Sequence, residues 1–198
     1  MMIMAMVLLG LCFGSFVNAW VWRLHEQSKP KKKRAASDNE LSITRGRSMC
    51  PYCKHTLAVK DLLPVISWLT LGGKCRYCKK PISWQYPLVE TLTALLFVIA
   101  YLSWPDSLNN WSFGVLQIAV FLSAIVVGMA LAVYDFKWML LPDKLVKIFS
   151  SFALIYAGLH MVNSDNTLST VFQLVLSVFV SGGIFYVLYQ ISNGKWIG

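Results

Sequence analysis

The sequence predicts an all-α polytopic membrane protein with about five transmembrane helices and one small cysteine-containing insert. Hydrophobic residues make up 57% of the 198 positions, and only 14% of the residues are charged. A water-soluble domain usually carries about 25% charged residues, so this chain has too few charges to cover a globular surface. The aromatic fraction of 14% excludes an intrinsically disordered chain.

Five long apolar runs supply the predicted spans. Each is close to the roughly 20 residues that a helix needs to cross about 30 Å of hydrocarbon. Backbone groups in lipid must hydrogen-bond within their own segment, so we expect each run to be a helix. The runs are Met1–Trp22, Tyr86–Trp104, Trp111–Tyr134, Leu145–Val162 and Leu168–Ile191.

The first run is interpreted as an uncleaved N-terminal anchor. A secretory signal peptide carries positive charge before its apolar run, whereas the first positive residue here, Arg23, follows the run. Cys12 lies inside this run, and we expect it to be a small apolar packing residue.

The positive charges predict the orientation in the membrane. Of the 18 Lys and Arg residues, 14 lie within the segment 23–80. If the N-terminus is outside, all 18 fall on the cytoplasmic face, as the positive-inside rule expects. The loops 105–110 and 163–167 are then outside, where they hold Asp106 and Asp165 but no Lys or Arg. The four remaining positive residues are Lys137, Lys144, Lys147 and Lys195.

These boundaries divide the chain into a first helix (1–22), a cytoplasmic insert (23–85) and the remaining membrane helices (86–198). The insert opens with a basic stretch, Lys29–Arg34. We interpret this stretch as a solvated linker or a contact for anionic lipid headgroups. Nucleic-acid binding is not expected, because neither interleaved aromatic residues nor a recognition helix accompanies the charges.

Four of the five cysteines form two similar pairs, Cys50-Pro-Tyr-Cys53 and Cys75-Arg-Tyr-Cys78, with 21 residues between them. On the cytoplasmic face they meet a reducing compartment, where disulfides seldom persist. Four thiolates suit a closed, structural Zn²⁺ site of zinc-ribbon type. Disulfides or free thiols remain the alternatives. His55 would be a surplus ligand and is expected to be a surface residue.

The apolar segment Leu62–Leu71 lies between the cysteine pairs and is too short to cross a bilayer. We expect it to pack beneath the metal site or to lie on the membrane surface. Glu90 falls just inside the second apolar run, where an ionisable group is costly and is expected to pair with a cation.

Two acidic residues near the third apolar run are the candidates for chemistry. Asp135 ends the run, and a carboxylate there opposes the helix dipole, which favours a functional role over a boundary residue neutralised by Lys137. Asp143 follows Pro142 and either caps the next helix or supports the chemistry. Two close carboxylates can share a proton and activate water. Eight helical residues would separate this pair by about 12 Å, so a partner from elsewhere would serve better.

Several motifs along almost the whole chain resemble those of the bacterial prepilin peptidases, also called type IV leader peptidases. They are Gly14-Ser-Phe-Val-Asn18 with Arg23-Leu24, Arg47-Ser-Met-Cys50-Pro-Tyr-Cys53, Asp61-Leu-Leu-Pro-Val-Ile-Ser-Trp68, Gly73-Lys-Cys75-Arg-Tyr-Cys78, Ile82-Ser83 with Tyr86-Pro-Leu-Val-Glu90, and Tyr134-Asp135 through Leu141-Pro142-Asp143.

The resemblance implies a multi-pass intramembrane aspartyl protease of the bacterial inner membrane. Such enzymes remove the leaders of type IV prepilins or type II secretion pseudopilins after a glycine, on the cytoplasmic face. Many also methylate the new N-terminus with S-adenosylmethionine. By this resemblance Asp135 is a catalytic carboxylate, and Cys50, Cys53, Cys75 and Cys78 form the metal-binding loop. No glycine-rich nucleotide loop indicates where the methyl donor binds.

The family's second aspartate lies in a Gly-x-Gly-Asp motif, and residues 1–198 hold no such motif. We therefore expect a C-terminally truncated member in which residues 1–198 alone do not cleave leaders. The alternative functions are a membrane-anchored zinc-binding adaptor and a methyltransferase without the peptidase.

Overall fold

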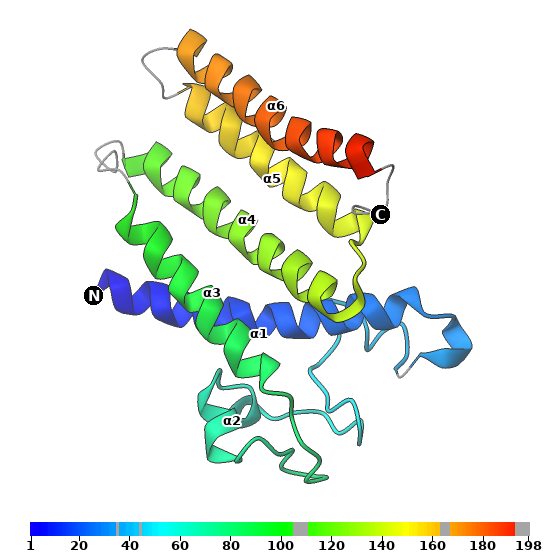
Figure 1. Cartoon of the computed structure of the whole chain (residues 1–198). Coiled ribbons are helices and arrows are strands. Elements are labelled where there is room, and N and C mark those ends of the chain that lie inside the picture. The colour runs from blue at the N-terminus through cyan, green and yellow to red at the C-terminus, as the bar shows by residue number, and fades with distance from the viewer. Residues whose placement is uncertain (35, 44, 105–110, 163–166, 193–198) are drawn as a thin grey trace. The chain divides into compact units, whose positions relative to one another are not determined.

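The computed structural model describes residues 1–34, 36–43, 45–104, 111–162 and 167–192. Throughout these residues the regular elements are helices, and the only strand-like pairings described are two isolated β-bridges. This confirms the predicted all-α class (Figure 1). The elements are α1 (Met2–Ser28), η1 (Lys31–Lys33), η2 (Val59–Asp61), α2 (Ile66–Thr70), α3 (Gln85–Leu102), α4 (Trp111–Trp138), α5 (Asp143–Val162) and α6 (Thr167–Ser192).

The five predicted apolar runs correspond to five long helices. Four of them, α1, α3, α4 and α5, are long and apolar enough to cross a membrane. The fifth, α6, has 26 residues, and its stretch Leu168–Ser177 is apolar. Large apolar side chains are exposed along these helices, as expected of surfaces that face lipid. The predicted loop 105–110, residues 163–166 of the predicted loop 163–167 and the segment 193–198 lie outside the described residues, whereas Thr167 begins α6.

The chain forms two compact units, residues 1–152 and residues 153–198. In the first unit, α1 packs against α3 and α4, and α3 packs against α4. A buried apolar cluster joins these helices and includes the first turn of α5. Its members are Val17, Trp20, Val21, Val89, Phe97, Val126, Val127, Ala130, Val133, Tyr134 and Leu145.

The backbones of α1 and α3 are in direct contact where α1 carries glycine. A Cβ added at Gly10 would lie 2.4 Å from the Cα of Ala94, and one added at Gly14 would lie 2.6 Å from the Cα of Glu90. Any larger residue would therefore force the helices apart. One turn further along α1, the buried Asn18 amide donates a hydrogen bond to the Tyr86 carbonyl at 3.1 Å.

The first helix is longer than the sequence predicted, because it continues past Trp22 to Ser28. Arg23, the residue after Trp22, is buried. Its guanidinium donates hydrogen bonds to the Ser42 carbonyl at 3.1 Å and the Gly46 carbonyl at 2.9 Å. The insert thus folds back on the last turns of α1. Because its backbone carbonyls bind the charge of Arg23, the helix can continue past this residue. The helix ends just before Pro30, which disfavours helical backbone at the preceding residue.

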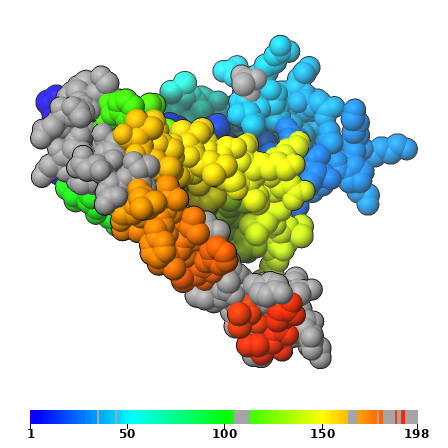
Figure 2. Space-filling view, turned by 90° about the horizontal axis from the view of Figure 1, so that it is seen from above, coloured from blue at the N-terminus to red at the C-terminus, as the bar shows by residue number. Residues whose placement is uncertain are grey.

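The segment that follows α1 projects away from the rest of the first unit (Figures 1 and 2). This segment contains the basic stretch, and the side chains of Lys31, Lys32 and Lys33 are exposed in it. Lys29 pairs with Glu26, and Lys31 and Arg34 pair with Asp38, but the exposed lysine side chains still face solvent and can reach a lipid surface.

The expectation for Cys12 was wrong. Its side chain is exposed on α1 and does not pack inside the protein. On a helix that spans the bilayer, such a position is compatible with contact to lipid.

Candidate functional site

The two cysteine pairs lie in two copies of one backbone turn. In the first knuckle (48–57), the Cys50 amide donates to the His55 carbonyl at 3.0 Å. The Lys54 amide donates back to the Cys50 carbonyl at 2.9 Å, and Lys54 adopts a left-handed φ of 57°. The turn therefore brings the thiols of Cys50 and Cys53 to the same side of the backbone.

The second knuckle (73–82) repeats these bonds. The Cys75 amide donates to the Lys80 carbonyl at 2.9 Å, the Lys79 amide donates to the Cys75 carbonyl at 3.0 Å, and Lys79 has a φ of 59°. Each knuckle also closes with an isolated antiparallel bridge. The internal repeat seen in the sequence is therefore a repeat of three-dimensional structure. The two knuckles together are called the metal loop below.

The four thiols are arranged so that they can hold a metal ion. The sulfur atoms of Cys50, Cys53, Cys75 and Cys78 all lie within 4.8 Å of one another, and Cys50 Sγ is 3.8 Å from Cys78 Sγ. A tetrahedral zinc site with Zn–S bonds of about 2.3 Å places its sulfurs about 3.8 Å apart. All four thiols are free, which excludes the disulfide alternative in this structure. The donor set and its spacing therefore fit zinc.

The surroundings of the thiols differ between the knuckles. Burial raises the pKa of the Cys50 thiol to about 11. Burial also raises the pKa of Cys75, but hydrogen bonds from the backbone amides of Cys78 and Tyr77 and from the neighbouring thiols outweigh it and bring that pKa to about 7. Of these two thiols, Cys75 is the more ready to act as a thiolate ligand.

A buried carboxylate ties the second knuckle to the chain between the knuckles. Asp61 accepts a hydrogen bond from Arg76 Nε at 2.7 Å, one from the Tyr77 hydroxyl at 3.1 Å and one from the Ala58 amide at 3.3 Å. Burial raises the pKa of Asp61, but these three donors and the Arg76 charge outweigh burial and lower it. The Tyr77 ring also lies 3.7 Å from the ring of His55, which is exposed as predicted.

The apolar segment between the knuckles packs partly beneath the metal loop, as predicted. In α2, Trp68 Nε1 donates to the Ile82 carbonyl at 3.1 Å. Gly73 has a φ of 68°, which favours glycine, and a Cβ added there would lie 3.0 Å from the Trp68 ring. Ile66 and Leu69 remain exposed on the other side of α2.

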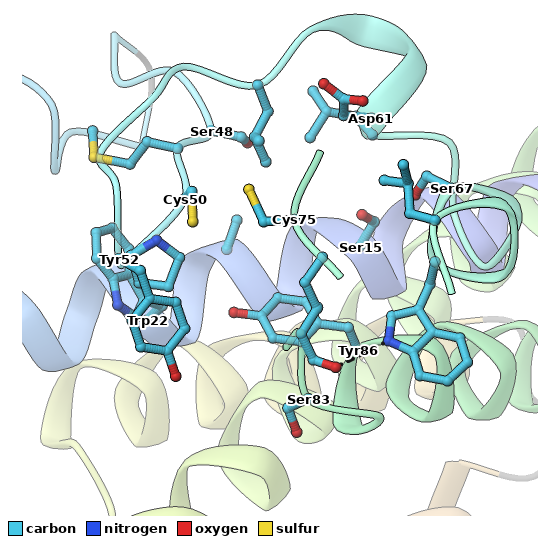
Figure 3. Close-up of a pocket in the computed structure, with 18 of the residues that line it drawn as sticks. Ser15, Trp22, Ser48, Cys50, Tyr52, Asp61, Ser67, Cys75, Ser83 and Tyr86 are labelled. Carbon is cyan, nitrogen blue, oxygen red and sulfur yellow. Dashed lines mark hydrogen bonds between the residues drawn. The ribbon is translucent and has the colours of Figure 1, made fainter. Parts of the chain in front are cut away.

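A cavity of about 300 Å³ separates the metal loop from the membrane helices (Figure 3). Its walls include Ser15 and Trp22 of α1 and Tyr86 of α3. Figure 3 shows Cys50 and Cys75 on the loop side and the Tyr86 ring on the helix side of this space. The site therefore combines the metal loop, a cavity and wall residues from α1, α3 and α4.

Glu90 lines this cavity with a partner that differs from the predicted cation. Its carboxylate accepts a hydrogen bond from the Val65 amide at 2.7 Å, and Ser15 lines the same cavity. Val65 has a φ of 60°, a conformation that is unfavourable for a β-branched residue. Glu90 therefore fixes the segment between the knuckles to α3. The sequence alone gave no means of finding a backbone amide as the partner.

The structure places the two predicted aspartates on either side of a helix break. Asp135 lies in the last turn of α4, which ends at Trp138, so it lies at the C-terminal end of a helix, as the sequence predicted. Met139 has a φ of 52°, and Asp143 is the first residue of α5. Both side chains are exposed, and within the described part of the chain neither carboxylate makes a hydrogen bond or ion pair.

A stack of rings that the sequence analysis missed holds the end of α4 against α1. The rings of His25 and Trp138 are 3.8 Å apart and nearly parallel, and Tyr134 lies edge-on to His25. Lys137 Nζ lies 5.2 Å from the centre of the Trp138 ring. These contacts fix the turn that carries Asp135. The sequence pointed to this contact only indirectly, because His25 follows Arg23-Leu24, which is part of a motif that resembles the prepilin peptidases.

Comparisons with known proteins agree with this picture. A family model described as the bacterial peptidase A24 N-terminal domain matches residues 8–104. The type 4 prepilin-like proteins leader peptide-processing enzyme of Escherichia coli O78:H11 is 34% identical over 93% of this chain and 65% of its own length. The prepilin leader peptidase/N-methyltransferase of Pectobacterium carotovorum subsp. carotovorum is 32% identical over 96% of this chain and 67% of its own length.

A similar relative, from Dickeya chrysanthemi, is 30% identical over 98% of this chain and 68% of its own length. The chain therefore spans about two thirds of the length of these curated relatives. No solved structure matches it. The matches extend along nearly all of the chain, and the chain therefore belongs to the prepilin leader peptidase/N-methyltransferase family.

Proposed function

We propose that the protein works as a membrane-embedded leader peptidase that cleaves prepilin or pseudopilin leaders and N-methylates the new N-terminus. The observation that carries this proposal is the 34% identity to a leader peptide-processing enzyme over 93% of the chain. No comparison favours the alternative of a zinc-binding adaptor.

In this proposal the peptidase chemistry is of the aspartic type, and Asp135 is one of its carboxylates. Support comes from its place in the last turn of α4, where an unpaired carboxylate opposes the helix dipole and gains no structural benefit. One carboxylate of such a pair acts as the base that activates water, while the other stays protonated. Because residues 1–198 hold no Gly-x-Gly-Asp motif, we propose that the second carboxylate of the pair comes from outside these residues, and residues 1–198 alone are expected not to cleave leaders. Asp143, at the start of the next helix, is the supporting residue.

The metal loop is proposed to hold one structural Zn²⁺ through Cys50, Cys53, Cys75 and Cys78. Four protein ligands leave no open position for a reacting group, so the ion shapes the loop and takes no part in the chemistry. The spacing of the sulfur atoms supports this assignment.

The proposed location is the bacterial inner membrane, with the N-terminus outside and the metal loop in the cytoplasm. This orientation places every Lys and Arg on one face. The methyl donor is proposed to be S-adenosylmethionine, whose sulfonium supplies an activated methyl group.

The test is leader cleavage in the host bacterium after Asp135→Asn is introduced into the gene. The variant should lower the cleavage rate by about 10²–10⁴-fold, the usual contribution of a general acid or base. Asp143→Asn should cause a smaller loss, and Asp38→Asn, on the exposed basic segment, should cause none. Precursor and mature pilin are separated by size. Normal processing by the Asp135→Asn variant would refute the assignment.

A further inference from the structure

The cavity beneath the metal loop has no role in the proposed peptidase chemistry. Its volume of about 300 Å³ lies at the lower end of the range for small-molecule sites, about 300–1,000 Å³. Aromatic, cationic and acidic side chains from α1, α3, α4 and the metal loop all reach its walls. Such a combination is typical of a ligand site that has been built by several elements.

We propose that this cavity binds the methyl donor, a sulfonium nucleoside such as S-adenosylmethionine. The inference rests on the proposed N-methylation and adds its binding site. A donor of this class presents a flat purine, a positively charged sulfur and the carboxylate of an amino acid. Each of these groups finds a matching group on the cavity wall.

The aromatic residues match the purine and the sulfonium. Trp22 from α1, Tyr86 from α3 and Tyr52 from the first knuckle all line the cavity (Figure 3). Aromatic faces stack on purine bases without need of a sequence motif. The same faces attract cations, including those that carry no hydrogen-bond donor. This explains how a donor can bind in a chain that lacks a glycine-rich loop.

Arg47 matches the carboxylate. Two other guanidinium groups on the wall are already engaged, since Arg23 binds the carbonyls of Ser42 and Gly46 and Arg76 binds Asp61. Arg47 lines the cavity but makes no hydrogen bond or ion pair with another described residue. A guanidinium binds a carboxylate through two parallel hydrogen bonds, so Arg47 is suited to hold the amino-acid end.

The cavity also lies near the proposed cleavage site along α4. Lys137 lines the cavity, and it follows Asp135 by two residues in the last turn of the helix. Two residues correspond to about 200° of rotation and a rise of about 3 Å, so the two side chains leave α4 on different faces at nearly the same height. Cleavage and methylation would then use neighbouring faces of one helix end.

The test is equilibrium dialysis of labelled S-adenosylmethionine against the full-length protein in phosphatidylcholine nanodiscs. Arg47→Gln should weaken binding about tenfold or more, because a charge-assisted contact is lost. The matched control is Arg45→Gln, since Arg45 is equally exposed but does not line the cavity. Trp22→Leu should weaken binding about fivefold or more. Trp84→Leu, outside the cavity, should not change it. Zinc content verifies that each variant is folded.

The outcomes separate this inference from the proposed function. Wild-type protein that binds no donor would refute the proposed methylation and the inference together. Wild-type binding that neither Arg47→Gln nor Trp22→Leu weakens would refute the cavity as the site and leave methylation in place. Arg47-dependent binding of phosphatidylglycerol, with donor binding unaffected by the variants, would assign the cavity to a lipid headgroup and also overturn the inference.

Discussion

Backbone hydrogen bonds and one buried ion pair give the metal loop its shape. The backbone bonds of each knuckle turn two thiols to one side, and the Asp61–Arg76 ion pair holds the second knuckle to the chain between the knuckles. The proposed zinc ion joins the two knuckles through its four cysteine ligands. Removing a ligand and removing the ion pair should therefore have different consequences.

Replacing one ligand should remove the metal. Cys75→Ser leaves three thiolates, and the purified protein should fall from one zinc per chain to nearly none, because structural sites depend on four ligands. Cys12→Ser, which changes an exposed thiol on α1, should keep one zinc. Metal content is measured by inductively coupled plasma mass spectrometry. A full zinc complement in Cys75→Ser would contradict the proposed ligand set.

Replacing Asp61 should loosen the loop without removing a ligand. Asp61→Asn should speed zinc loss to a chelator about fivefold, which corresponds to about 1 kcal/mol because the Arg76 partner is partly exposed to solvent. Asp38→Asn, which breaks an exposed ion pair with Arg34, is the matched control and should have no effect.

The pH dependence of this effect follows from the lowered pKa of Asp61. A carboxylate whose pKa is lowered on folding stabilises the fold above its unfolded pKa of about 3.9, and this contribution is lost only as the pH falls through the lower folded value. The difference between wild type and Asp61→Asn should therefore be the same at pH 7 and pH 5.5. A difference that disappears by pH 5.5 would contradict the lowered pKa.

Much of the metal site could be predicted from the sequence, because its geometry depends on residues that are close together in the chain. Two Cys-x-x-Cys pairs close their turns through bonds between near neighbours in the sequence, so the pattern predicts the geometry. The partners of Glu90 and Asp61 were not predictable, because the Val65 amide and Arg76 lie 25 and 15 positions away. Only the fold brings them together.

Helix α1 is the element on which the rest of the first unit is assembled. It packs on α3 where Gly10 and Gly14 lie and on α4 through His25, and Arg23 near its end binds the insert. The sequence predicted the apolar part of this helix correctly. It missed the last turns, since a charged residue usually indicates the end of a span, and here Arg23 is buried against backbone carbonyls.

The close approach of α1 and α3 predicts a sharp response to added volume. Gly14→Ala would place a Cβ 2.6 Å from the Cα of Glu90, and backbone atoms cannot move away as a flexible side chain can. The stability should fall by about 1–3 kcal/mol. The matched control is Gly158→Ala in α5, where an added Cβ meets nothing within 4 Å.

Thermal unfolding in detergent measures this effect. The Tm of Gly14→Ala should lie several degrees below that of the wild type, while Gly158→Ala should match or slightly exceed it, because alanine favours helix more than glycine does. Equal Tm values for the two variants would show that α1 and α3 are not in backbone contact.

For the whole molecule, the proposed function requires that the metal loop and the end of α4 face the same aqueous compartment. The distribution of Lys and Arg predicted this from the sequence. The positive-inside rule needs only the positions of these residues along the chain and does not depend on how the helices pack. The packing of α4 against α1 through His25 and Trp138 could not be predicted, since it joins residues far apart in the chain.

The most direct test of this central claim is labelling of single introduced cysteines with a membrane-impermeant thiol reagent. Lys33→Cys lies in the exposed basic segment, Phe136→Cys is next to Asp135 and 90% exposed, and Ile3→Cys lies at the opposite end of α1. Each is made in a Cys12→Ser background and compared with that background before and after the cells are permeabilised.

We expect the reagent to label Ile3→Cys in intact spheroplasts, and to label Lys33→Cys and Phe136→Cys only after permeabilisation. Labelling of Lys33→Cys and Phe136→Cys on opposite sides of the membrane would contradict it, because the metal loop and the proposed catalytic carboxylate would then never meet the same substrate.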